Sequence, residues 1–442
     1  MKAAKIPYLL NIAFFILALF LSFASKVDSK TWDWFPDTKD YLNQSKISVY
    51  SSEFYFTHSH PGFYPRPFTV PLFYKLTGSN PKRIVWMQKF MHCLATFILV
   101  YSLLLMFKTR VARYISILPI YFLMSWWNIF GWTTQVLSES LILSFLFLWI
   151  GTFLIFFIKR KPWFLAIHIF TTILFSFTRD SWPYVLIFFY LIILIIAWIW
   201  DKPIVKSTLI MLFLSIAVYF IQGKSSEIGQ RTELPVINNI LVRILSNHKQ
   251  FDWFVIKGMP MGGILKQRFT NNSWKVYGLY VDPEYKPFRG WAAEKGKGLY
   301  TRFLLTHPRY TLLLDESPDN IKRIYSVNVG YVTPLNGYSI YAEKRFPFFS
   351  TFSLVVCVFL LLLVFIWKRK VEIILPIAFT LLFIFNTFLL YNADSMEVAR
   401  HLFITMILIQ FLCIWMVSLL IDRTIQDLYL IEGKTIIRIG GA

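Results

Sequence analysis

A short stretch early in the chain carries acidic and aromatic side chains at spacings that suit proton transfer. Its candidates are Asp33, Asp37, Asp40 and Tyr41. Pro36 favours the first turn of a short helix, where Asp37 would meet the positive end of the helix dipole and share a side with Tyr41. Such a carboxylate can take a proton from a hydroxyl group as a general base. Helix capping is the alternative interpretation of any one of these acids.

Further ionisable side chains lie at the ends of apolar segments, where burying charge is costly and usually functional. Glu139 opens a long apolar run between two serines, and Arg179 and Asp180 share a short polar connection. A later segment would line one side of a helix with Asp394, Glu397, Arg400 and His401. The alternatives are a solvated helix end for Glu139, a mutual or lipid-phosphate ion pair for Arg179 and Asp180, and an internally satisfied turn for the later segment.

Several of these positions have the chemistry of phosphate and metal ligands. Arginine binds phosphate through a planar fork, so the candidate phosphate ligands are Arg66, Arg179, Arg400 and His401. His58 and His60 lie two residues apart and could bind a divalent metal together with a carboxylate. Two histidines alone do not define a metal site, and the sequence predicts no certain cofactor.

The composition indicates that the protein is embedded in a membrane. Of the 442 residues, 56% are hydrophobic and only 16% are charged, whereas soluble domains have about 25% charged residues. Lipid must therefore cover the apolar surface. The net charge of +21 lies partly in short basic runs beside apolar segments, which is typical of membrane topology signals rather than of nucleic-acid binding.

The apolar segments predict an all-α polytopic membrane protein with roughly ten transmembrane helices. Their expected positions are 7–25, 86–107, 114–131, 138–158, 163–178, 183–200, 207–222, 350–367, 372–391 and 402–421. Lys2 and Lys5 before the first segment allow a signal peptide, but an uncleaved first helix is preferred because the segment is long enough to span.

Basic residues concentrate in every second connection, which places those connections on the cytoplasmic side. They are Lys108, Arg110, Arg113, Lys159, Arg160, Lys161, Lys202, Lys206, Lys368, Arg369 and Lys370. The opposite side then carries two long loops, 26–85 and 223–349. We expect a transmembrane module over 1–222 with the first loop, a lid region over 223–349, and terminal helices with a cytoplasmic tail over 350–442.

Several classes of chemistry lack a signal in the sequence. No phosphate-binding Walker motif, no Gly-x-Gly-x-x-Gly turn and no zinc-type cysteine cluster occurs. The three cysteines all lie in apolar segments, so a disulfide framework is not expected. An enzyme working outside the cytoplasm has no nucleotide-activated substrate, but a lipid-borne sugar phosphate would supply an activated donor. That chemistry needs an acid to deprotonate the acceptor and cations to hold the phosphate.

Three segments resemble the GT-C superfamily of polyprenyl-phosphate-sugar-dependent glycosyltransferases, such as protein mannosyltransferases and aminoarabinose transferases. They are 36–41, 137–141 and 394–401, and the layout of a long first outer loop, a seven-span core and a large later loop is also similar. The resemblance implies that Asp37 is the base, with Asp40 and Asp33 as substitutes, and that Glu139 is a second active-site acid. The family often has adjacent acids in the first loop, which this chain lacks, so the base and any metal requirement stay open.

The resemblance also implies the partners and the location. The donor would be a polyprenyl-phosphate sugar, and the acceptor a glycan, lipid or protein outside the plasma membrane, with inverting transfer by single displacement. A lipid-linked glycan polymerase or O-antigen ligase is the nearest alternative, and it would not need the acids after the first span. A transporter or flippase would instead place charges or broken helices near the bilayer midplane. A scaffold protein would tolerate loss of every acid on the outer face.

Overall fold

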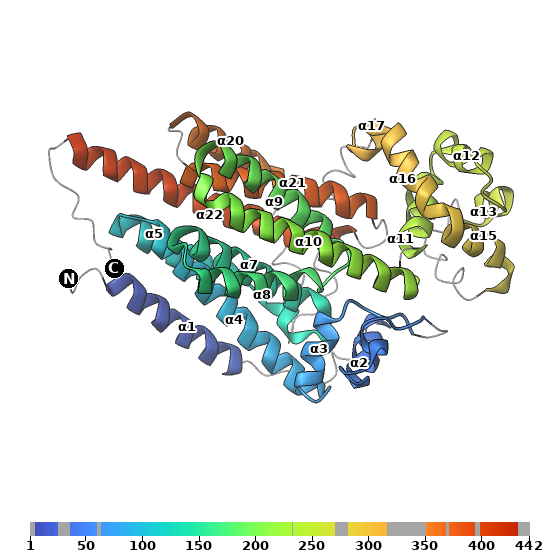
Figure 1. The fold of residues 1–442 in the computed structure, drawn as a ribbon, viewed down its shortest axis with the longest axis horizontal. Helices are drawn as coiled ribbons and strands as arrows, with labels where there is room; N and C mark the ends of the chain where they lie inside the picture. Colours follow the sequence, from blue (N-terminus) through green and yellow to red (C-terminus); the bar gives the residue numbers. More distant parts are fainter. Residues whose placement is uncertain are drawn as a thin grey trace.

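The described part of the chain is helical, and it contains no β-strand. The computed structural model describes residues 5–24, 36–59, 63–231, 233–269, 282–315, 351–367, 371–393 and 398–431. Long helices form a bundle, and a layer of shorter helices covers one end of it (Figure 1). The all-α polytopic membrane class expected from composition is confirmed at this level by the apolar helices.

Each predicted span coincides with a helix. The helices are α1 (Ile6–Ala24), α4 (Pro81–Met106), α5 (Arg110–Ser125), α7 (Ser138–Lys159), α8 (Pro162–Ser176), α9 (Trp182–Trp200), α10 (Lys202–Ile228), α20 (Thr351–Trp367), α21 (Val371–Ala393) and α22 (Val398–Ile431). Within the described residues, seven helices are long and apolar enough to cross a membrane. Helices α5, α8 and α20 are shorter, so ten crossings stay a prediction.

Several span boundaries differ from the sequence-based prediction, and α5 ends at Ser125 although that span was expected to run to 131. Helix α4 begins at Pro81 rather than 86, α10 runs on past 222 to Ile228, and α22 continues past 421 to Ile431. The hydropathy pattern marks only the part of a helix that lipid covers, whereas polar side chains stabilise the extensions. Lys224 pairs with Glu227 at 3.0 Å in the extension of α10.

Helix α7 is the central helix of the bundle. It is apolar all round and nearly every one of its residues is buried, as expected for a helix enclosed by others. Its closest neighbour is α4, because Gly151 has no side chain to hold the two backbones apart. A Cβ atom at Gly151 would lie 3.0 Å from Ile98 Cγ2 and 3.2 Å from the backbone nitrogen of Leu99. Small residues at such crossings are typical of membrane helices.

We expect Gly151→Ala to destabilise the fold, because the new methyl group must push against the backbone of α4. Overpacking of this kind costs about 1–3 kcal/mol. The measurement is the thermal unfolding midpoint of the purified protein in detergent. Gly223→Ala is the matched control, since nothing lies within 4 Å of a Cβ atom at that position of α10. Equal midpoints for the two variants would contradict the close approach of α4 and α7.

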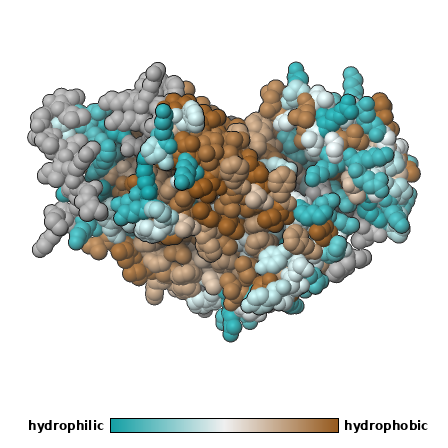
Figure 2. All heavy atoms as spheres, viewed as in Figure 1, coloured by the Kyte–Doolittle hydropathy of each residue, from teal (hydrophilic) through white to brown (hydrophobic). Residues whose placement is uncertain are grey.

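The predicted lid region forms a helical cap layer, which we define as the described residues 233–269 and 282–315. Its elements are α11 (Glu233–Asn238), η5 (Asn239–Ile244), α12 (His248–Ile256), α13 (Gly262–Phe269), η7 (Pro283–Tyr285), α15 (Lys286–Trp291), η8 (Ala292–Gly296), α16 (Lys297–Thr306) and α17 (Pro308–Thr311). The layer has a hydrophobic core of its own, which includes Phe254, Phe288 and Phe303. Figure 2 shows hydrophilic surface over this layer and apolar surface over the bundle.

The cap layer is fastened to the end of α21. The Arg243 guanidinium lies between the rings of Tyr310 and Tyr391, 3.9 and 3.7 Å from their centroids. Arg243 also donates to Asn392 Oδ1 at 3.2 Å, and Tyr300 donates to the Asn392 carbonyl at 2.8 Å. Cation–π contacts and hydrogen bonds therefore fix the layer on the bundle.

The connections rich in basic residues, which were predicted to share one side of the membrane, contact one another at one end of the bundle. At the end where α1 begins and α22 ends (Figure 1), the Thr109 amide donates to Asp422 at 2.6 Å, and Arg160 pairs with Asp201. At the other end lie the cap layer, α2 (Pro36–Lys46) and α3 (Thr69–Leu76). Which end faces the cytoplasm stays a prediction.

Candidate functional site

Helix α2 holds the first acidic motif against the start of α7. The predicted short helix is confirmed: Pro36 opens α2, and Asp37 lies in its first turn. Thr38 Oγ1 donates to the Val136 carbonyl at 2.9 Å, and Tyr74 of α3 donates to the Leu137 carbonyl at 2.9 Å. These bonds join the first loop to the residues that immediately precede α7.

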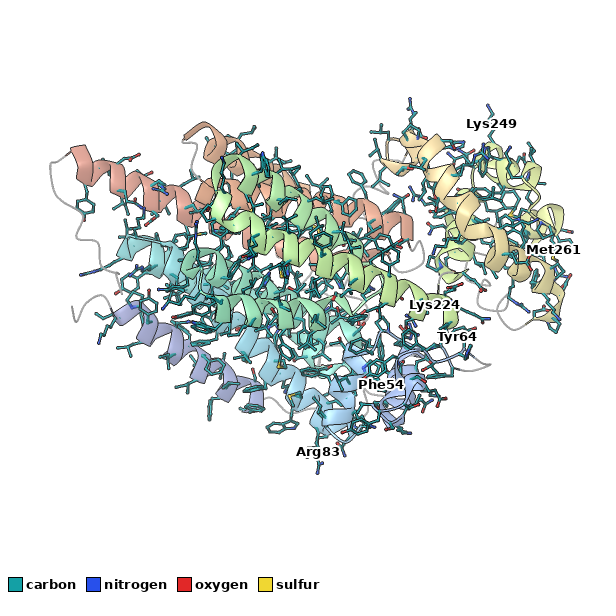
Figure 3. All side chains as sticks on the ribbon, viewed as in Figure 1. Phe54, Tyr64, Arg83, Lys224, Lys249 and Met261 are labelled. Atoms are coloured by element: carbon teal, nitrogen blue, oxygen red, sulfur yellow. The ribbon has the colours of Figure 1, made fainter. Side chains whose placement is uncertain are left out.

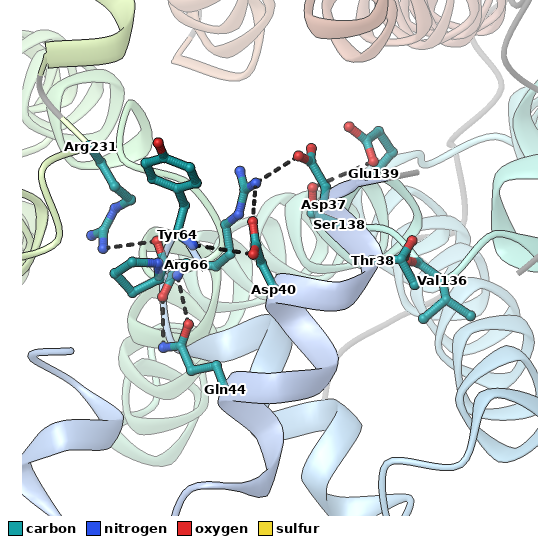
Figure 4. A network of polar contacts seen from close by, with 11 residues as sticks. Asp37, Thr38, Asp40, Gln44, Tyr64, Arg66, Val136, Ser138, Glu139 and Arg231 are labelled. Atoms are coloured by element: carbon teal, nitrogen blue, oxygen red, sulfur yellow. Dashed lines mark hydrogen bonds and ion pairs between the residues drawn. The ribbon is translucent and has the colours of Figure 1, made fainter. Parts of the chain in front are cut away.

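Arg66 bridges the two described aspartates of the motif. Its Nη2 atom lies 2.6 Å from Asp37 Oδ1 and 2.7 Å from Asp40 Oδ2 (Figure 4). The guanidinium also lies 5.5 Å from the ring centroid of Tyr41. Arg66, a predicted phosphate ligand, therefore lies among the predicted acids, and it is arranged to hold their carboxylates in place.

The backbone around Arg66 is clamped to α2. The Arg66 amide donates to Gln44 Oε1 at 2.6 Å, and Gln44 Nε2 donates to the Arg66 carbonyl at 2.9 Å. The Tyr64 amide donates to Asp40 Oδ1 at 3.2 Å. Side chains one turn apart on α2 thus fix both the arginine and the chain leading to it. The sequence alone offers no signal for Gln44.

Burial sets the protonation behaviour of this group. Burial raises the pKa of Asp40, and the nearby Arg66 opposes that rise without cancelling it. Burial alone would lower the pKa of Arg66, but Asp37, Tyr41 and Asp40 raise it above its usual value, so the guanidinium stays charged. Burial also raises the pKa of the Tyr41 phenol, so that Tyr41 keeps its proton at neutral pH.

Glu139 and Asp37 are far apart in sequence, but both lie close enough to Tyr41 to act on it electrostatically (Figure 4). Glu139 is fully buried in the first turn of α7, and the Ser138 hydroxyl contacts its Oε2 atom at 3.4 Å. We call Asp37, Asp40, Arg66 and Glu139 the acidic cluster. The three acids predicted to share a catalytic site are therefore brought together by α2 and α7.

Asp180 pairs with Arg231, rather than forming the mutual pair with Arg179 considered from the sequence. Arg231 Nε lies 2.9 Å from Asp180 Oδ2, and Gln222 Nε2 donates to Asp180 Oδ1 at 2.6 Å. Arg231 also donates to the Pro65 carbonyl at 3.3 Å, directly before Arg66 (Figure 4). Asp180 therefore supports the loop that carries Arg66 through Arg231. Arg231, which follows an apolar span, is a positioning residue that sequence reasoning missed.

The metal prediction gains no support from the described residues. Among them, no group of three His, Cys, Asp or Glu side chains is arranged to hold a metal ion. His58 is exposed and lines a cleft of about 660 Å³ in the first loop, together with Glu53 and Asn43. His60, the other candidate ligand, lies outside the described residues.

Part of the predicted site lies beyond what the structure describes. Asp33, Asp394 and Glu397 are outside the described residues, and the side chains of Arg400 and His401 are likewise outside them. The backbone of Arg400 and His401 belongs to the start of α22. The role predicted for this segment stays a prediction.

The fold and the acidic cluster define the class: an all-α polytopic membrane protein with carboxylates and arginine gathered at one bundle end. Comparisons with protein-family models, curated proteins and solved structures found no match to this chain.

Proposed function

We propose that this protein is an integral membrane glycosyltransferase that moves a sugar from a polyprenyl-phosphate donor to an extracytoplasmic acceptor. The observation that carries the proposal is the acidic cluster. Asp37 and Asp40 of α2 meet Arg66 of the first loop and Glu139 of α7. A membrane anchor does not need charge gathered from separate segments and buried at one end, because such burial is costly.

Asp37 is the proposed general base. Its side chain is 27% exposed, compared with 9% for Asp40, so an acceptor hydroxyl can reach it more easily. Asp37 would take the hydroxyl proton while the acceptor oxygen bonds to the anomeric carbon of the sugar. The bond from that carbon to the phosphate oxygen breaks, and the lipid phosphate leaves with the electron pair. Arg66 holds the Asp37 carboxylate in its orientation through their ion pair at 2.6 Å.

The proposed phosphate ligands are Arg179, Arg400 and His401, with Arg66 next to the departing charge. Arginines suit this role because the leaving phosphate gains negative charge as the bond breaks. The proposed location is the plasma membrane, with the acidic cluster on the extracytoplasmic face. The acceptor class, a glycan, lipid or protein, follows from that side of the membrane.

A transporter would require functional polar groups inside the bundle. Among the described residues, the largest side-chain network there joins α7, α8 and α9, and smaller buried pairs such as Tyr121 with Asn11 and Asn386 with Thr405 lie elsewhere. His168 Nε2 lies 2.8 Å from the Tyr190 hydroxyl, and Thr152 Oγ1 lies 3.2 Å from His168 Nδ1. Trp149 Nε1 donates to the Tyr190 hydroxyl at 3.0 Å. Each of these polar groups bonds to another side chain, so the network serves helix packing and does not favour transport.

The test is mass spectrometry of the envelope glycans from cells that lack this protein. Loss of one sugar from one glycan, restored by the wild-type chain, would support the proposal, and the mass difference would name the sugar. Unchanged glycans, in cells whose other envelope lipids and transported solutes do change, would contradict it. A changed chain length without a missing sugar would indicate a polymerase or ligase instead.

On acidification, the rate of sugar transfer should begin to fall while the pH is still above 3.8, the ordinary pKa of aspartate. The reason is that the pKa of Asp40 is raised. As the pH falls through that raised pKa, Asp40 gains a proton and its bond to Arg66 loses its ionic part. The free energy of unfolding changes in the opposite direction to the rate. Because the folded state binds the Asp40 proton more tightly than the unfolded chain does, Asp40 stabilises the fold as the pH falls, and acid does not unfold the protein through this group. Rates and unfolding midpoints measured in parallel from pH 4 to 7 check both. A rate that is flat down to pH 4 would contradict the prediction.

A further inference from the structure

A groove lies at the end of α4, on the other side of α3 from the acidic cluster. It has a volume of about 510 Å³ and is lined by Leu76, Thr77, Lys82, Arg83, Trp86 and Met87. Arg83 lies at the edge of the bundle, where α3 meets α4 (Figure 3). Tyr74 of α3 bonds toward α7 instead, so α3 separates the groove from the cluster.

The groove pairs two cations with an apolar wall. Lys82 and Arg83 are exposed in the first turn of α4, and none of the six lining residues is acidic. In the described part of the chain, no ion pair joins either cation to a carboxylate. Leu76 is 68% exposed and Trp86 is 41% exposed. A ligand that fits needs both an anionic head and an apolar body.

The length of α4 places the groove at the boundary between lipid tails and head groups. Its 26 residues give a helix of about 39 Å, compared with about 30 Å of hydrocarbon in a bilayer. The first turn, with Lys82 and Arg83, therefore extends into the head-group region. Trp86, one turn deeper, stacks on Phe23 of α1 with ring centroids 4.6 Å apart. Tryptophan is typical of this boundary.

We propose that this groove binds one anionic phospholipid of the surrounding leaflet. The phosphate head would contact Lys82 and Arg83, and the upper part of the acyl chains would lie against Trp86, Leu76 and Met87. A soluble anion would use the cations but would leave the exposed apolar wall uncovered. A zwitterionic lipid would cover the wall but would carry an ammonium group toward the cations. Only an anionic lipid satisfies both halves of the groove.

The experiment is native mass spectrometry of the full-length protein released from nanodiscs of phosphatidylglycerol and phosphatidylcholine with identical chains. Wild-type protein should retain one phosphatidylglycerol in preference to phosphatidylcholine. Lys82→Gln with Arg83→Gln should weaken that retention by about 10- to 30-fold. Each Lys or Arg near an anionic lipid surface strengthens binding by about 3- to 5-fold, and the double variant removes two such cations. Lys295→Gln with Lys297→Gln is the matched control, because both lysines are exposed on the cap layer.

Three outcomes would overturn the proposal: equal retention by the two double variants, equal retention of both lipids by the wild type, or displacement of the lipid by inorganic phosphate in the millimolar range. The last would indicate a simple anion site. Trp86→Leu is a second variant that keeps the cations and the apolar character, and it should weaken retention less than the double charge variant. An unchanged unfolding midpoint in lipid-free detergent shows that each variant is folded.

Discussion

Asp37→Asn is expected to reduce sugar transfer by about 10²–10⁴-fold, the usual contribution of a general base. The amide has nearly the same shape as the carboxylate, so it can still accept a hydrogen bond from Arg66, which lies 2.6 Å from Asp37 Oδ1. It cannot take a proton from the acceptor hydroxyl. The rate should therefore fall while the unfolding midpoint changes little. The measurement is single-turnover transfer by purified protein in lipid, with the protein in excess over the donor.

The control for Asp37→Asn is Asp201→Asn at the opposite bundle end. Asp201 also pairs with an arginine, Arg160, so it reports what the loss of such an ion pair does by itself. We expect transfer by this variant to match the wild type. If Asp37→Asn transfers sugar at the wild-type rate, then Asp37 is not the base, and Asp40 and Glu139 become the candidates. Equal losses in both variants would indicate a structural effect.

The helices and the first acidic motif were predictable because both depend on short-range patterns. Apolar runs indicated the spans, and Pro36 with Asp37 in the first turn indicated α2. Composition also separated the two bundle ends, because basic residues recur in every second connection. The predicted ends of α10 and α22 were wrong, because hydropathy does not register helical turns that polar side chains stabilise outside lipid.

The pairings within the site were not predictable, because they join residues far apart in the chain. Arg66 was a candidate phosphate ligand by residue type, yet it bridges Asp37 and Asp40. Arg231 gave no signal, although it links Asp180 to the loop that holds Arg66. Residue type and spacing identify which charges are costly to bury, whereas only the packing of α2 on α7 determines which charges meet.

Arg66→Met is expected to lower both stability and transfer, unlike Asp37→Asn. It removes the cation between two carboxylates, and Asp40 is too deeply buried to regain its hydration. Breaking a fully buried ion pair costs about 3–5 kcal/mol. The loss here should be smaller, because about a quarter of the Arg66 and Asp37 side chains is exposed. Unfolding midpoints in detergent and transfer rates in lipid measure the two effects.

A double variant separates the two roles of Arg66. Asp40→Asn added to Arg66→Met removes the buried charge that lost its partner, so part of the unfolding midpoint should return. Transfer should not return, because Asp37 would still lack the guanidinium that holds its carboxylate in place. Arg160→Met is the matched control, since Arg160 pairs with Asp201 away from the cluster. Recovery of transfer together with stability would show that Arg66 acts only in folding.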